Sequence, residues 1–97
     1  MDRAQKQAIL RAMIETEENV AALYRLYASR FKEDREFWVE IAREEEGHAA
    51  MLGSAAFHLA LDRLPDAVLV DKLDELRVTN TSIRKITAHR ARRPRME

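Results

Sequence analysis

The first thirty-one residues carry apolar side chains at the spacing of one face of an α-helix. Residues 2–31 contain neither glycine nor proline. Because side chains three, four or seven residues apart fall on one stripe of a helix, this segment is predicted to form a long amphipathic helix. The stripe consists of Leu10, Met13, Val20, Tyr24, Tyr27 and Phe31.

A second helix is predicted after the charged segment 32–36. Asp34 is expected to cap its first turn, and the helix should run to about Leu61. Pro65 can start a helix but cannot continue one, so the helix must end before it. The two helices are therefore expected to form an antiparallel hairpin over residues 2–62. The apolar stripe of the second helix is Trp38, Ile41, Leu52, Ala55 and Leu59.

A third helical segment is predicted over residues 65–91. The weak helix formers of Val78–Thr81 interrupt it before Ile83, so one helix with a kink and two separate helices both remain open. Residues 1–93 are thus expected to be one all-α domain, followed by a basic tail over residues 92–97. The apolar face of the third segment is Val68, Leu69, Leu73 and Leu76.

The composition agrees with an all-helical protein and limits the chemistry. Among 97 residues there are two glycines and two prolines, against 46% hydrophobic and 35% charged residues. A chain this short buries a small share of its surface alone, which favours a partner subunit. Cysteine is absent, which excludes disulfides, thiolate zinc sites and iron–sulfur clusters. A bound metal would therefore need oxygen and nitrogen ligands.

The apolar runs are too short to cross a membrane, which needs about 20 residues, and the first ten residues lack the apolar core of a signal peptide. A cytoplasmic protein without a membrane partner is expected. Residues 84–97 carry a net charge of +5, balanced by −5 in the rest of the chain. This basic end has two interpretations, a solvated helix end favoured by the helix dipole or a docking surface for an acidic partner. Nucleic acid is the less favoured partner.

Three polar residues interrupt the apolar stripes. Glu17 lies one turn from Met13 and Val20 on the first helix, while Glu45 and His48 share the stripe of the second. Burying an unpaired charge is costly, so such groups are normally protonated, paired or bound to a metal. A Glu-x-x-His step places an oxygen and a nitrogen ligand on one helix face about a turn apart.

The three residues are expected to lie at one level of the hairpin. In an antiparallel pair of helices, equal sequence distance from the turn means equal height. Glu17 lies fifteen residues before residue 32, whereas Glu45 lies thirteen and His48 sixteen after it. Two-metal sites of helical bundles take a glutamate from each of two helices and a Glu-x-x-His from each of two others. A two-fold dimer would supply that complete set.

These residues resemble the rubrerythrin and ferritin-like di-iron superfamily over roughly residues 13–52. The resemblance implies that Glu17, Glu45 and His48 bind iron, with manganese or zinc as alternatives. The chain is similar to the half-bundle type of encapsulated ferritin, which completes a four-helix bundle and a shared di-iron ferroxidase site by dimerisation. The matching motifs are Glu17 with Tyr24, Tyr27 and Ala28, and Ile41-Ala42-x-x-Glu45-x-x-His48-Ala49.

The resemblance implies oxidation of ferrous iron by oxygen or peroxide, for storage or detoxification, in a homodimer or a larger even-numbered assembly. One alternative is a peroxide reductase of the rubrerythrin kind with an external electron donor. Another is a metal-free helical adaptor. The tail over residues 91–97 does not resemble an apolar encapsulin-targeting peptide, so a role as encapsulated cargo is not predicted.

Tyr24 has two interpretations beside the proposed ligands. Its phenol could hydrogen-bond to a ligand carboxylate or be redox-active near the metals, or its ring could simply pack in the core. Trp38 and Tyr27 are expected to pack without a chemical role. His58 is expected at a surface or interface position, and His89, among basic residues near a helix end, is a poor ligand candidate. Glu44 is expected to be solvated, with an alternative interpretation in which it helps cations approach the site.

Overall fold

The computed structural model describes residues 1–93 and is all-α within them. α1 spans Arg3–Arg30, and a short 3-10 turn, η1 (Lys32–Asp34), connects it to α2 (Arg35–Leu52). Two short helices follow, α3 (Ala55–Asp62) and α4 (Asp66–Leu69), before the long α5 (Lys72–Arg92). Residues 94–97, which include part of the predicted basic tail, lie outside the described residues.

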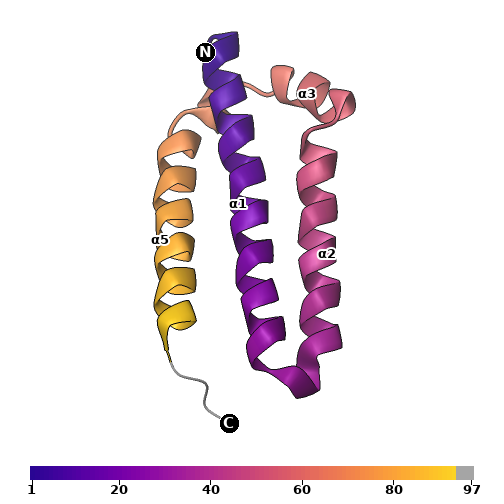
Figure 1. Cartoon of the computed structure of the whole chain (residues 1–97). Coiled ribbons are helices and arrows are strands. Elements are labelled where there is room, and N and C mark those ends of the chain that lie inside the picture. Colours follow the sequence, from indigo (N-terminus) through magenta and orange to yellow (C-terminus); the bar gives the residue numbers. More distant parts are fainter. Residues whose placement is uncertain (94–97) are drawn as a thin grey trace.

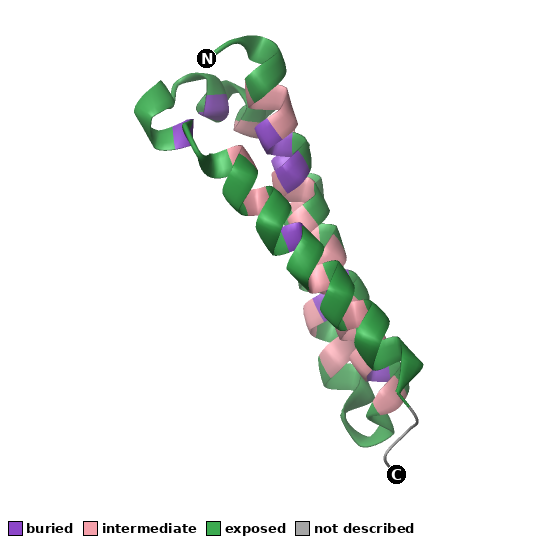
Figure 2. Ribbon diagram, turned by 90° about the vertical axis from the view of Figure 1, so that its left-hand side faces the viewer, coloured by how far each residue is buried: buried purple, intermediate pink, exposed green. Residues whose placement is uncertain are grey.

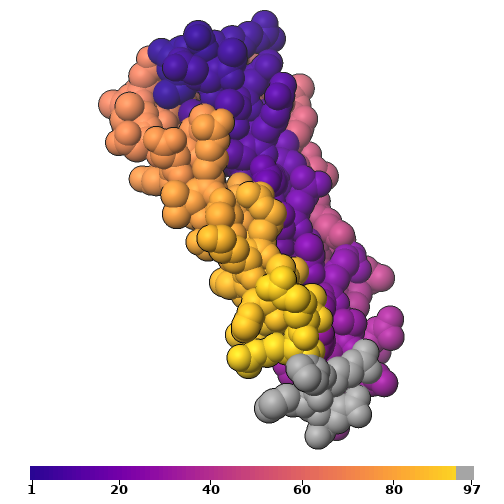
Figure 3. All heavy atoms as spheres, turned by 60° about the vertical axis from the view of Figure 1, so that its left-hand side comes forward, coloured from indigo at the N-terminus to yellow at the C-terminus, as the bar shows by residue number. Residues whose placement is uncertain are grey.

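α1 is the central element of the fold. It packs against α2 in an antiparallel hairpin on one side and against α5 on the other (Figure 1). The three long helices therefore form one elongated layer with extents of 50 × 24 × 16 Å. Figure 3 shows α5 lying along α1 over most of its length. In residues 1–93 the helices lack an apolar stretch long enough to cross a membrane.

The predicted hairpin is confirmed, and local signals explain its first helix. Asp2 accepts a hydrogen bond from the Gln5 backbone N–H, and the Gln5 side chain accepts one from the Asp2 N–H, both at 2.8 Å. This reciprocal pair satisfies two of the free N–H groups at the helix start. Asp34 occupies the position before α2 as expected, but its side chain makes no capping hydrogen bond.

The second helix is shorter than predicted. It ends at Leu52 rather than continuing to about Leu61, because the chain bends at Gly53 and Ser54 and starts α3. The Ser54 hydroxyl accepts a hydrogen bond from the Phe57 N–H at 3.3 Å, which caps the new helix. Ala55 and Leu59 therefore belong to α3, which turns across the end of the hairpin (Figure 1).

The buried apolar side chains larger than alanine gather at that end of the molecule. Figure 2 shows buried positions concentrated near α3, while the long helices are mostly half-buried or exposed. α3 and α4 cover this end because each supplies a leucine to the cluster. The buried cluster consists of Ile9, Leu10, Leu52, Leu61 and Leu69.

The third segment consists of two helices, and the break lies at Val70 and Asp71. The weak helix formers around Val78–Thr81 lie inside α5 instead. Asn80 explains this, because the residue is only 2% exposed and both polar atoms of its side chain are hydrogen-bonded to α1. It donates to the Ala12 carbonyl at 3.1 Å and accepts from the Asn19 side chain at 3.2 Å. This tertiary contact outweighs the low helix propensity.

Candidate metal centre

Glu17 of α1 and the pair Glu45 and His48 of α2 converge at one level of the hairpin. One ligand atom from each residue can be chosen so that the three atoms all lie within 4.8 Å of one another. His48 Nδ1 lies 3.8 Å from a Glu17 carboxylate oxygen and 3.6 Å from a Glu45 carboxylate oxygen. The prediction that these three residues share one layer is therefore confirmed.

The three side chains differ in exposure. Glu45 and Glu17 are half-buried, with 22% and 28% of their side chains exposed, whereas the His48 side chain is 56% exposed. The prediction that all three point into the core is thus wrong for His48 within one chain. His48 is therefore the exposed member of the group, although its Nδ1 atom lies close to both carboxylates.

The close approach of the two carboxylates raises the pKa of Glu17 to about 7 from an ordinary value of 4.5. The largest cause is a side-chain hydrogen bond with Glu45, followed by burial and by the negative charge of Glu45. The charge of His48 and its hydrogen bond with Glu17 lower the pKa of Glu17. One proton between the two carboxyl groups therefore relieves their repulsion, and a cation bound between them would do the same.

The donor set fits a metal ion of the predicted type. Two carboxylates and one imidazole suit iron, manganese or zinc rather than a soft metal. In catalytic metal sites three protein ligands leave further coordination positions open. The three residues of one chain could thus hold an ion while leaving part of its coordination sphere open.

Tyr24 does not hydrogen-bond to a ligand carboxylate among the described residues. Its ring lies against that of Trp38, with the ring centroids 5.8 Å apart. Trp38 also contacts Tyr27 at 4.9 Å. Trp38 was expected to pack without a chemical role. Its contact with both tyrosines also follows from equal sequence distance on either side of the hairpin turn. Trp38 lies six residues after residue 32, while Tyr27 and Tyr24 lie five and eight before it.

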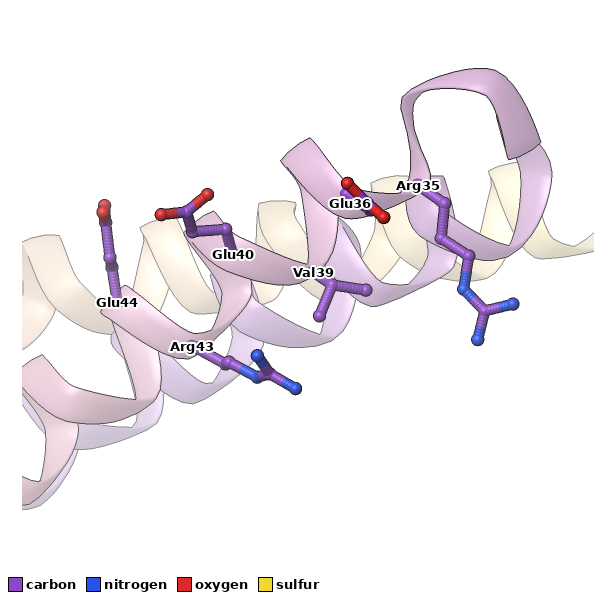
Figure 4. A pocket seen from close by; sticks show the side chains of 6 residues that line it. All are labelled: Arg35, Glu36, Val39, Glu40, Arg43 and Glu44. Atoms are coloured by element: carbon purple, nitrogen blue, oxygen red, sulfur yellow. The ribbon is translucent and has the colours of Figure 1, made fainter.

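The two glutamates that flank Glu45 in the sequence, Glu44 and Glu46, lie outside the group of three converging residues. Glu46 pairs with Arg25 across the hairpin at 2.5 Å, which lowers the pKa of Glu46. Glu44 lines a shallow groove of about 840 Å³ on α2. In Figure 4 the carboxylates of Glu40 and Glu44 point away from the guanidinium groups of Arg35 and Arg43. The groove carries both charges and does not include the three converging ligands.

The remaining histidines lie apart from the converging ligands. His58 lines a separate cavity of about 500 Å³ between the start of α1 and α3, and His89 is exposed near the end of α5. His58 is exposed, so its predicted surface position is confirmed. Part of the basic end is engaged with α1, because Arg84 pairs with Glu15 and Arg90 lies over the Tyr27 ring.

No protein-family model, curated protein or solved structure matches this chain.

Proposed function

We propose that two copies of this chain bind ferrous iron at a site built from Glu17, Glu45 and His48, and oxidise it for storage or detoxification. The observation that carries the proposal is the convergence of these three donors from two helices. Their register also underlies the resemblance to the ferritin-like di-iron superfamily.

The residues suit iron oxidation for electrostatic reasons. Two carboxylates with little room between them are more strongly stabilised by a trivalent ion than by a divalent one, so the site favours the ferric product. Binding iron releases the proton that Glu17 and Glu45 share in the free protein. Each ferrous ion gives one electron to oxygen or peroxide, which acts as the oxidant.

A second copy is needed because one chain supplies half of a two-metal ligand set. The exposed side of α2 supports such a contact, since Phe37 and Met51 are 58% and 59% exposed on the same stripe as His48. Their spacing is that of a helix–helix seam, with alternating steps of four and three residues. The stripe reads Phe37, Ile41, Glu44, His48 and Met51.

In this proposal a two-fold axis near His48 brings the two hairpins together as a ferritin-like four-helix bundle. The dimer then contains four carboxylates and two imidazoles at one level. The exposed His48 imidazole gains a partner surface, and the apolar side chains of the stripe leave water.

The test is an anaerobic ferrous titration followed by native mass spectrometry. We expect a dimer with two iron ions, and oxidation on adding oxygen. Glu45→Ala should lose iron binding, whereas Glu40→Ala, a matched change on the outer face of the same helix, should keep it. Equal binding by the two variants would contradict the proposed site.

The same titration separates this function from a metal-free adaptor. If a dimer formed equally well with a chelator present and with Glu45 substituted, and no iron bound, the exposed stripe would serve oligomerisation alone. A reduced protein that reacts faster with peroxide than with oxygen would instead favour a peroxide reductase with an external donor.

A further inference from the structure

All the readily oxidised aromatic rings of the chain lie in one contact group. The sequence contains one tryptophan and two tyrosines. Trp38 of α2 contacts both tyrosines of α1, with ring centroids 5.8 Å from Tyr24 and 4.9 Å from Tyr27. Aromatic packing alone would be served equally by phenylalanine, which is also present at Phe31 and Phe37.

The group begins two helical turns from the proposed ligands. Tyr24 lies seven residues after Glu17, and Trp38 lies seven residues before Glu45. Both rings therefore lie about 10 Å from the ligand layer along their helices, on the same stripe as the ligands. Tyr27 lies about one further turn toward the hairpin turn.

The far end of the group reaches other parts of the molecule. The Tyr27 ring contacts Phe31, which is 50% exposed, and Arg90 of α5 lies over its face at 5.7 Å. The three oxidisable rings are themselves half-buried. A phenoxyl radical at Tyr27 would thus lie away from the ligands and beside the exposed end of the hairpin.

We propose that Trp38 and Tyr24, which lie at the same distance from the ligand layer, are parallel donors of a single electron to the iron site. Electron transfer from Tyr27 to Trp38, whose rings are in contact, then leaves the oxidised group at Tyr27. This electron relay rests on the proposed function, because ferrous iron and peroxide create the demand for it. Peroxide needs two electrons, and a site with only one ferrous ion supplies one.

The balanced step uses the relay for the missing electron. One hydrogen peroxide, one ferrous ion, one tyrosine phenol and one proton give two waters, one ferric ion and one neutral phenoxyl radical. When Trp38 is oxidised on the way, its indole loses an electron and a proton and regains both as the Tyr27 phenol is oxidised. An external hydrogen-atom donor such as ascorbate then restores the phenol. The protein thereby avoids releasing a hydroxyl radical beside His48.

The first experiment uses the metal-free protein. Azide radicals generated by pulse radiolysis oxidise Trp38, and transient absorption follows the indolyl radical. We expect it to convert into a phenoxyl radical at a rate independent of protein concentration. The double variant with Tyr24→Phe and Tyr27→Phe should lose this conversion. Persistence of the indolyl radical in the unmodified chain would overturn the relay.

The second experiment loads one ferrous ion per dimer and adds one equivalent of peroxide, followed by freeze-quench electron paramagnetic resonance. In Tyr24→Phe the only remaining phenol is Tyr27, so a tyrosyl signal reports that residue. We expect the signal to be lost when Trp38→Phe is added. It should be kept when Phe31→Leu, a redox-inert change at a ring 5.9 Å from Tyr27 and outside the proposed seam, is added instead.

The outcomes separate the two proposals. If iron binds and the Tyr27 signal survives Trp38→Phe, the relay is wrong while the proposed function stands. If iron does not bind, the proposed function fails, and the relay fails with it even where the metal-free rings exchange electrons.

Discussion

Replacing Glu17 by glutamine should change how the stability of the metal-free protein depends on pH. In the folded chain Glu17 shares a proton with Glu45, and its pKa is about 7 instead of 4.5. Between pH 4.5 and about 7, the folded state therefore holds a proton that the unfolded state has released. The stability from this proton is fully present below pH 4.5 and is lost as pH rises through about 7.

The size of the effect follows from the same shift. A change from 4.5 to about 7 corresponds to about 3 kcal/mol as an upper limit. The Glu17 side chain is 28% exposed, and solvent screening reduces the effect to about 1–2 kcal/mol. In Glu17→Gln the amide can still donate to Glu45 but does not titrate. We expect this variant to be more stable than the unmodified chain at pH 8 by about 1–2 kcal/mol, with little difference at pH 4.5.

The measurement is denaturant unfolding followed by circular dichroism, with chelator and at one protein concentration. The difference in the free energy of unfolding between the variant and the unmodified chain reports position 17 alone, because both proteins contain the same histidines. Glu18→Gln, a change at the neighbouring exposed carboxylate, is the control and should leave the pH dependence unchanged. A constant difference for Glu17→Gln from acidic to basic pH would refute the shared proton.

Three further changes probe the fold and the interface. Asn80→Ala should lower the free energy of unfolding by about 2 kcal/mol, because a buried amide loses hydrogen bonds to Ala12 and Asn19; calorimetry would show an unchanged melting temperature if the contact were unimportant. Ser54→Ala should cost about 1 kcal/mol through the lost cap, seen as a lower denaturant midpoint, and Ser54→Thr should largely restore it. Met51→Lys should leave the helical content intact but weaken the dimer in sedimentation experiments, since Met51 is 59% exposed on the proposed seam; an unchanged association constant would count against that seam.

The sequence predicts the hairpin well because its signals are local. An apolar stripe in a segment without glycine or proline defines α1, although Glu17 interrupts the stripe. The charged segment after Phe31 separates α1 from α2. The ligand layer follows from counting residues on either side of the turn, which depends only on regular helix geometry. This explains why the approach of Glu17, Glu45 and His48 was foreseeable without tertiary information.

The predictions that were wrong concern residues whose sequence is compatible with more than one structure. Gly53 and Ser54 are tolerated within a helix, and the bend there is stabilised by the Ser54 cap and by burial of Leu61. The weak helix formers around Asn80 stay helical because of a contact with α1. The exposure of His48 could not be read from periodicity, since a stripe defines a face but not which neighbour covers it.

The central position of α1 has a consequence for motion. All three proposed ligands belong to α1 and α2, while α5 packs along the other flank of α1 and contacts α4. Local opening of α5 would thus leave the hairpin and its three converging side chains intact. Amide hydrogen exchange should accordingly be slowest in α1 and faster in α5. A metal held by the hairpin would slow exchange in α1 and α2 and leave that of α5 nearly unchanged.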